Sequence, residues 1–333
     1  MTRKIHDTDY LFLTTRVRAL EGCLLNRGQM EQMLEAGSPE EAARILTDCG
    51  YPELETVSAI TVGEMLTRER ERLFQDLAEL VPDPAILAVF QLPHDYHNVK
   101  VLLKSEAMGI QEDRLLVDAG RIPSKQLAAA LRSGEVQNLP PQLGEAIDEA
   151  RQVLSATRDP QLGDMVLDRC YFQELLVLAE ETGSLFLQGY VQRMIDAANL
   201  RTVVRVLRMG QGTEFLEGIL FPGGNMEVER LLTGINGGSM LEELYASSPL
   251  VRAAETGAMA ARRGSLTQWE KDCDDAVLDE VRRAQFVAFG EAPVIAYLAA
   301  KEAEILAIRI ILTGRLADLA PDIIRERLRE AYV

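Results

Sequence analysis

Apolar residues recur every three or four positions along nearly the whole chain, and no convincing stretch alternates between apolar and polar residues. This period predicts helices that each bury one apolar face. Five clear examples cover residues 40–51, 85–92, 162–179, 250–263 and 322–333. The sequence therefore predicts an all-α protein.

Start and stop signals fit the same reading. Ser38 and Pro39 precede the helix predicted over 40–51, and serine is a good N-cap while proline fits a first helical turn. Asp159 and Pro160 stand in the same way before the helix over 162–179. Short clusters of glycine, proline and asparagine separate the helical stretches, at 120–123, 138–141, 210–212, 221–225 and 234–238. Connections this short are typical of tightly packed helices.

One short polar pattern occurs twice along the chain. An aspartate is followed by an asparagine three residues later, a basic residue two further on, and a second basic residue four after that. Recurrence at a fixed interval indicates structural repeats. The residues are Asp95, Asn98, Lys100 and Lys104 in the first copy, and Asp196, Asn199, Arg201 and Arg205 in the second.

A third, looser copy lies near the end of the chain. Glu304 stands near the asparagine position, and Arg309 lies one residue out of step with the second base. The apolar run around Arg309 reads as a helix with one apolar face, because Ile305, Ile308 and Leu312 step by three and four. Three divergent helical units follow, over 1–110, 111–212 and 213–333, each of a common domain size.

Charge and composition narrow the classes of function. With 35 basic and 52 acidic residues, the formal net charge of −17 disfavours binding to nucleic acid. The longest apolar run, 294–312, carries four charged residues, so we expect no membrane span. The N-terminus lacks the apolar core of a signal peptide, and the four widely spaced cysteines are expected to be reduced, buried thiols of a cytoplasmic protein.

Motifs that could carry chemistry are weak. His94 and His97 sit three residues apart with no third ligand nearby, so we predict no metal site there, and we expect Asp95 to cap the following helix. The glycine-rich stretches 221–225 and 234–238 match no phosphate-binding loop and are expected to be turns between helices. No nucleophile or metalloprotease signature is present, and we predict no catalytic residue and no cofactor.

The repeated helices are the strongest candidates for a partner surface. Each repeat core carries a small positive net charge in a strongly acidic chain. The simpler interpretation is local ion pairing, which is common and stabilises little at a surface. The alternative hypothesis is that three equivalent helices line a central opening that receives an acidic partner. The candidate contact residues are Asn98, Lys100, Lys104, Asn199, Arg201, Arg205, Glu304 and Arg309.

Several stretches resemble one known family. The segment 10–22, the two repeats, the run 297–315 and the terminus 324–333 are similar in order and character to the C subunits of V-type and A-type rotary ATPases. That family includes the d subunit of the membrane sector of the eukaryotic V-ATPase. The resemblance covers about residues 8 to 333. Glu304 departs from the asparagine of the other copies, so equivalence of the third copy is not carried over residue by residue.

The resemblance implies a fold and a role. The fold would be a funnel of three helical domains related by a pseudo-threefold axis, without a membrane span of its own. The protein would sit on the cytoplasmic end of the proteolipid rotor ring and receive the central stalk, made of D-type and F-type subunits. It would transmit torque between ATP chemistry and transport of protons or sodium, without being a catalyst.

Two other hypotheses compete with this one. The first is a free-standing helical scaffold or adaptor unrelated to an ATPase, which predicts a soluble monomer that does not associate with membranes. The second is an enzyme that uses an unrecognised pair of acids, which predicts a deep pocket holding a carboxylate of strongly shifted pKa. No motif in the sequence favours the enzyme.

Overall fold

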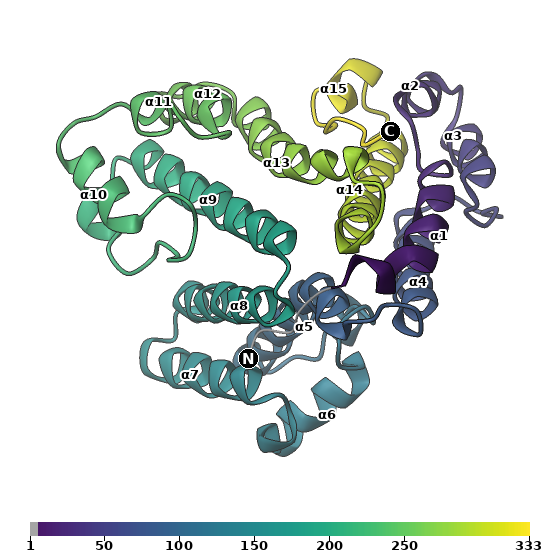
Figure 1. Ribbon diagram of the computed structural model, residues 1–333. Helices are drawn as coiled ribbons and strands as arrows, with labels where there is room; N and C mark the ends of the chain where they lie inside the picture. Colours follow the sequence, from purple (N-terminus) through teal and green to yellow (C-terminus); the bar gives the residue numbers. More distant parts are fainter. Residues whose placement is uncertain (1–5) are drawn as a thin grey trace. The chain divides into compact units, whose positions relative to one another are not determined.

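Helices are the only regular structure in residues 6–333, the part of the chain that the computed structural model describes (Figure 1). The predicted all-α class is therefore confirmed for these residues. They form two units, described one at a time: Arg70–Ser184, and His6–Glu69 together with Leu185–Val333. The threefold funnel and the boundaries at 110 and 212 stay predictions.

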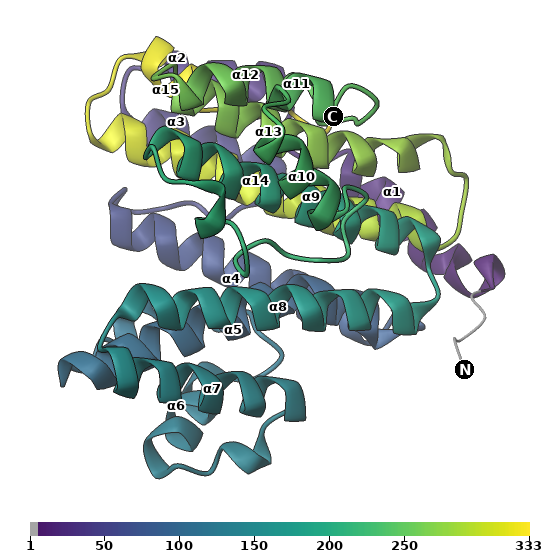
Figure 2. The same ribbon diagram turned by 90° about the vertical axis from the view of Figure 1, so that its left-hand side faces the viewer.

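The first unit is built mainly from three long helices and one shorter one. α5 (Pro84–Met108) and α7 (Pro141–Thr157) both pack against α8 (Pro160–Thr182), and α6 (Ser124–Ser133) packs on α5 (Figures 1 and 2). Their apolar faces form the core of the unit, in which many side chains are fully buried. Examples are Ile86, Leu92, Val99, Leu127, Leu143, Ile147, Leu167 and Leu175.

The second unit contains a comparable set of helices. α9 (Leu185–Arg208), α12 (Val251–Ala261) and α13 (Leu266–Arg282) pack on one another. The single tryptophan, Trp269, lies fully buried on α13 in their shared core, as expected for the apolar face of a helix. Two short helices complete this part, α10 (Val228–Asn236) and α11 (Leu241–Leu244).

The rest of the second unit is built around the longest helix. α14 (Glu291–Leu316) contacts α1 (Leu11–Glu21), α2 (Arg27–Glu35), α3 (Pro39–Ile45), α13 and α15 (Pro321–Arg325). Ile308, Ile311 and Leu312 lie fully buried against the N-terminal helices. Segments nearly 300 residues apart in the sequence thus share one core. Figure 2 shows α9, α13 and α14 with their axes close to one common direction.

The remaining elements are α4 (Ala59–Ala78) and several short 3-10 helices. α4 begins in the second unit and ends in the first. None of the helices from residue 6 onward is long and apolar enough to cross a bilayer. The 3-10 helices are Asp7–Tyr10, Leu46–Cys49, Asp113–Leu115, Val136–Asn138, Thr213–Phe215 and Arg283–Phe286.

Helix starts largely follow the predicted capping signals. The Ser38 hydroxyl accepts from the backbone N–H of Glu41 at 3.2 Å at the start of α3. The Asp159 carboxylate accepts from the N–H of Gln161 at 2.9 Å at the start of α8, which carries Pro160 in its first turn. Both caps satisfy N–H groups that a helix leaves unpaired at its start.

Three predictions about local structure are wrong. The helix predicted over 322–333 ends at Arg325, because the tail beyond it is held by tertiary contacts such as Arg329 Nε to Asp274 at 2.7 Å. Asp95 is no cap, since it lies in the middle of α5, whose N-cap is Asp83. Cys23 is exposed and Cys170 is partly exposed, so only Cys49 and Cys273 are the buried thiols expected; all four are free.

Candidate functional site

Asn98 on α5 and Asn199 on α9 hold a loop in the same way, each inside its own unit. The Asn98 amide donates to the carbonyl of Val117 and accepts from its N–H, both at 2.8 Å. Asn199 binds Phe221 through the same two bonds, at 2.7 and 2.8 Å. Both asparagines are fully buried, so each is a matched donor and acceptor for an interior peptide group.

The aspartate three residues earlier fixes the same loop further on. Asp95 accepts from the Arg121 Nε at 2.7 Å and from the Ile122 N–H at 3.3 Å. Burial is the largest effect on its pKa, which is raised, although Arg121 opposes that rise. The loop approaches so closely that a Cβ on Gly120 would lie 2.2 Å from the Asp95 carboxylate.

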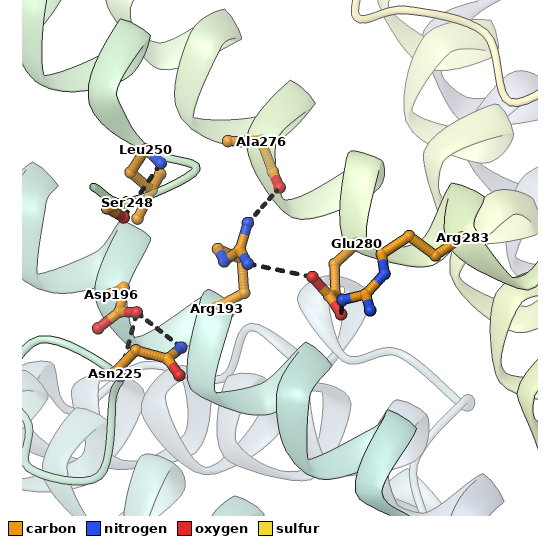
Figure 3. A network of polar contacts seen from close by, with 8 residues as sticks. All are labelled: Arg193, Asp196, Asn225, Ser248, Leu250, Ala276, Glu280 and Arg283. Atoms are coloured by element: carbon orange, nitrogen blue, oxygen red, sulfur yellow. Dashed lines mark hydrogen bonds and ion pairs between the residues drawn. The ribbon is translucent and has the colours of Figure 1, made fainter. Parts of the chain in front are cut away.

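The second unit repeats this arrangement without the arginine. Asp196 accepts from the N–H and the side-chain amide of Asn225, at 3.1 and 3.0 Å (Figure 3). It also accepts from the N–H of Met226 at 2.9 Å. A Cβ on Gly224 would lie 2.2 Å from the Asp196 carboxylate. The stretch 221–225 therefore connects helices, as predicted, whereas residues 234–236 form the end of α10 and only 237 and 238 turn. Gly120 and Gly224 allow the backbone to pass over a buried carboxylate.

Glu304 takes the place of the asparagine on α14. Its carboxylate accepts from the N–H of Leu25 at 2.6 Å and from the Tyr51 hydroxyl at 2.5 Å. Lys301, one turn earlier, donates to Glu304 at 2.7 Å and pairs with Glu69 at 3.0 Å. The third copy thus anchors an N-terminal loop to α14, and a lysine stands where the other copies have aspartate.

The basic residues of the repeats form two matching ladders of ion pairs. In the first unit, α5 pairs with α8 through Lys100–Asp168 at 2.5 Å and Lys104–Asp164 at 2.6 Å. In the second, α9 pairs with α13 through Arg201–Asp274 and through Arg205–Glu270 at 3.2 Å. Local pairing, the simpler sequence interpretation, therefore accounts for these four charges, and each ladder ties one long helix to its neighbour.

Each ladder ends at a buried glutamate that the sequence reasoning missed. In the first unit, Glu174 accepts from Arg121 at 2.7 Å and from the Tyr96 hydroxyl at 2.9 Å. In the second, Glu280 accepts from Arg193 at 3.0 Å and Arg283 at 2.7 Å (Figure 3).

A sequence signal for these acids was present. Asp164, Asp168 and Glu174 on α8 have the same spacing as Glu270, Asp274 and Glu280 on α13. This shared spacing of acidic residues on α8 and α13 could have indicated the partners of the basic residues on α5 and α9.

The eight candidate contact residues differ in the surface they offer. Asn98, Asn199 and Glu304 are buried, and Lys100 and Arg201 are mostly covered by their ion pairs. Lys104 and Arg205 keep 40% and 59% of their side-chain surface exposed, and Arg309 is exposed on α14. That any of the eight contacts another subunit stays a prediction.

The two histidines and the acids form no cluster suited to a metal. His97 Nε2 lies 3.1 Å from the carbonyl of Leu115. Burial, followed by the charge of Arg70, lowers the pKa of His94 to about 3, so its ring is neutral at physiological pH. Nowhere between His6 and Val333 do three or more histidine, cysteine, aspartate or glutamate side chains gather as metal ligands would.

Comparison with known proteins gives one consistent result. A sequence profile of the family described as ATP synthase (C/AC39) subunit matches residues 13–327. The chain is 27% identical to the C subunit of the V-type sodium ATPase of Enterococcus hirae, over 97% of this chain and 99% of the relative. It is 26% identical to the C subunit of the V-type ATP synthase of Thermus thermophilus, over 93% and 94%.

An archaeal relative extends the similarity. The chain is 23% identical to the C subunit of the A-type ATP synthase of Methanocaldococcus jannaschii, over 96% of this chain and 86% of the relative. Bacterial and archaeal proteins thus match 93–97% of the chain, and the family profile spans α5, α9 and α14. The chain belongs to the ATP synthase (C/AC39) subunit family, the C subunits of V-type and A-type rotary ATPases.

Proposed function

We propose that this chain is the non-catalytic central-axis adaptor of its rotary ATPase. In this role it caps the proteolipid rotor ring and receives the D-type and F-type subunits of the central stalk. Torque then passes through it between ATP hydrolysis or synthesis and the transport of protons or sodium. The relatives whose names include a sodium ATPase and ATP synthases support both directions of this coupling.

The observation that carries the proposal is the repeated anchoring of long helices to loops and to neighbouring helices. Torque must pass without being absorbed, and closely packed interiors with few voids transmit strain. Asn98, Asn199 and Glu304 each fasten a loop to a long helix through a buried side chain. The ion-pair ladders add contacts from α5 to α8 and from α9 to α13.

The threefold funnel is part of the proposal. Each of the three anchoring helices would belong to one domain, with divisions near residues 110 and 212. The polar edges of these helices would face a shared axis, where the exposed Lys104, Arg205 and Arg309 would meet the stalk or the ring. The chain would lie peripherally on the cytoplasmic side of the membrane, held there by its partners.

Co-purification tests this role. The tagged full-length chain is recovered from detergent-solubilised host membranes at moderate salt, and the chains that accompany it are identified by mass spectrometry. Recovery of the proteolipid ring and of central-stalk subunits is the expected result. Recovery of the chain alone, from the soluble fraction, would refute the role and favour a free-standing scaffold.

A further inference from the structure

A groove of about 820 Å³ opens at one end of the first unit, where α5 and α7 end and α8 begins. We call it the terminal groove. Its apolar surface comes from Leu103, Met108, Leu154 and Pro160, and its charges include Arg151 and Arg158. None of the anchoring contacts described above lies among its lining residues.

The walls of the terminal groove are fixed in place. Arg151 donates to Glu106 at 3.0 Å and to the carbonyl of Leu131 at 2.7 Å, which ties the end of α7 to α5 and α6. α8 meets α7 so closely that a Cβ on Gly163 would lie 2.9 Å from Leu154. A preformed surface loses little entropy when a partner binds.

Arg158 has an unusual backbone conformation at the edge of the groove. It ends α7 in the left-handed region, with φ at +56°, whereas α5, α6 and α8 end in that region with Gly109, Gly134 and Gly183. Glycine adopts this conformation without strain, and a residue with a Cβ does not. Within residues 6–333 no group lies at hydrogen-bond distance from the Arg158 guanidinium, so its charge is available to a ligand.

The same two features recur in the second unit. Met209 follows the end of α9 as Met108 ends α5, and the two side chains are 60% and 63% exposed. The turn between α12 and α13 contains Arg263 in the left-handed region, with φ at +76°. An exposed methionine and an arginine in a strained turn thus accompany corresponding helix ends twice in one chain.

The chemistry of the groove indicates its ligand. An open groove whose lining is mostly apolar suits a helix laid into it, and methionine adapts to the side chains it meets. An unpaired arginine at the edge complements a carboxylate. We propose that the terminal groove binds an amphipathic helical segment of the central stalk, with apolar side chains against Met108 and Leu154 and an acidic residue at Arg158. This proposal rests on the adaptor role.

The test uses the purified full-length chain and, as separate probes, the isolated central-stalk subunits and the detergent-solubilised proteolipid ring of the same complex. The variants are Arg158→Glu, Met108→Asp and Arg158→Gly. Exposed positions elsewhere in the first unit supply matched controls, Arg114→Glu and Leu115→Asp. Dissociation constants are measured by biolayer interferometry, and melting temperatures by calorimetry.

We expect Arg158→Glu and Met108→Asp to weaken stalk binding at least about tenfold, while the controls and all ring affinities change less than about twofold. Arg158→Gly relieves the backbone strain, so it should bind the stalk more weakly and yet melt at the same temperature or slightly higher. If Arg158 only stabilises the end of α7, Arg158→Gly should leave stalk binding unchanged and lower the melting temperature.

Two results would overturn the proposal and are distinguishable from failure of the adaptor role. If the unaltered chain binds the stalk and the groove variants bind it equally well, the groove is not the site. If the variants bind the proteolipid ring more weakly and the stalk as tightly as before, the groove binds the ring and not the stalk. Failure of the unaltered chain to bind either probe would refute the adaptor role itself.

Discussion

Helices α5 and α9 are held in their units by the same two side chains, but the charges around those side chains differ. Each helix offers a buried aspartate and asparagine to a loop that turns on a glycine. Arg121 supplements the anchor in the first unit, where it joins Asp95 to Glu174. In the second unit Asn225 binds the aspartate, and Arg193 pairs with the glutamate separately.

The comparison shows that the bonds between the asparagine and the loop are the same in both units, whereas the partners of the aspartate differ. In both units a loop N–H and a carbonyl meet one side-chain amide, and no other arrangement is used. The partner of the aspartate varies: it is an arginine in the first unit and neutral donors in the second. α14 differs more. Glu304 accepts the loop N–H in place of an asparagine, and Lys301 puts a positive charge where the other two helices have an aspartate. The fixed element is the attachment of the loop. Removing the anchoring side chains tests it, and changing the groups around them tests how far the two units are equivalent.

The largest effect is expected from removing the charged anchor on α14. Glu304→Ala leaves Lys301 with only Glu69, and it leaves the Leu25 N–H and the Tyr51 hydroxyl unpaired in the interior. Because buried donors left without an acceptor cost about 1–3 kcal/mol each, the free energy of unfolding should fall by about 3–5 kcal/mol. Urea denaturation followed by circular dichroism measures this. Glu302→Ala, on the same helix, is the control, and equal loss in both variants would contradict the anchoring role.

The two asparagines should be equivalent. Asn98→Ala and Asn199→Ala each leave a partly buried N–H and a partly buried carbonyl unpaired, so each should cost about 2–3 kcal/mol. Amide hydrogen exchange should show the loss of protection in 113–124 for the first variant and in 216–228 for the second. Asn138→Ala, at an exposed position, should change little. A twofold difference between the two buried sites would contradict their equivalence.

Acid should destabilise the first unit more than the second. The pKa of His94 is lowered to about 3 from an ordinary value near 6.5, so its contribution to stability is complete above pH 6.5 and is lost as the pH falls toward 3. The corresponding position of α9 is Ile195, which cannot titrate. Between pH 7 and pH 4.5, His94→Ile should lose about 2–3 kcal/mol less stability than the unaltered chain.

The unfolding free energies of the two proteins, measured by denaturation at each pH, give this difference. Carboxyl groups such as Asp95 titrate in both proteins and largely cancel in the comparison. Parallel pH profiles would show that His94 is not kept neutral by burial.

The smallest effects belong to the ion-pair ladders. Lys100, Asp168, Arg201 and Asp274 are all partly exposed, so double-mutant cycles with alanine should give coupling energies of about 0–1 kcal/mol for either pair. Raising the salt concentration should reduce both. A coupling above about 2 kcal/mol in one pair alone would mean that the two ladders are not equivalent.

Helical class and repeated residues could be predicted from the sequence because they depend on period and local spacing. Asn98 and Asn199 were identified in this way, and the start of α3 at Ser38 followed from capping chemistry. Asp95 was mistaken for a cap because aspartate is a favoured N-cap residue. In the structure α5 continues through Pro93 without a break.

The roles of the same residues could not be predicted, because their partners lie far along the chain. Asp168 pairs with Lys100 from 68 positions away, and Glu304 binds the N–H of Leu25 from 279 positions away. Only packing brings such groups together. The end of α15 is similar: the sequence after Arg325 has a helical period, but contacts such as Tyr332 to Glu21, at 3.2 Å, hold it in another conformation.

The coupling of ATP hydrolysis to ion transport tests the adaptor role most directly. Membrane vesicles are prepared from cells that lack this chain, and ATP hydrolysis and ion uptake are measured before and after the purified chain is added back. The adaptor role predicts that uptake per ATP hydrolysed is near zero without the chain and is restored by it. Undiminished ion uptake in its absence would contradict that role.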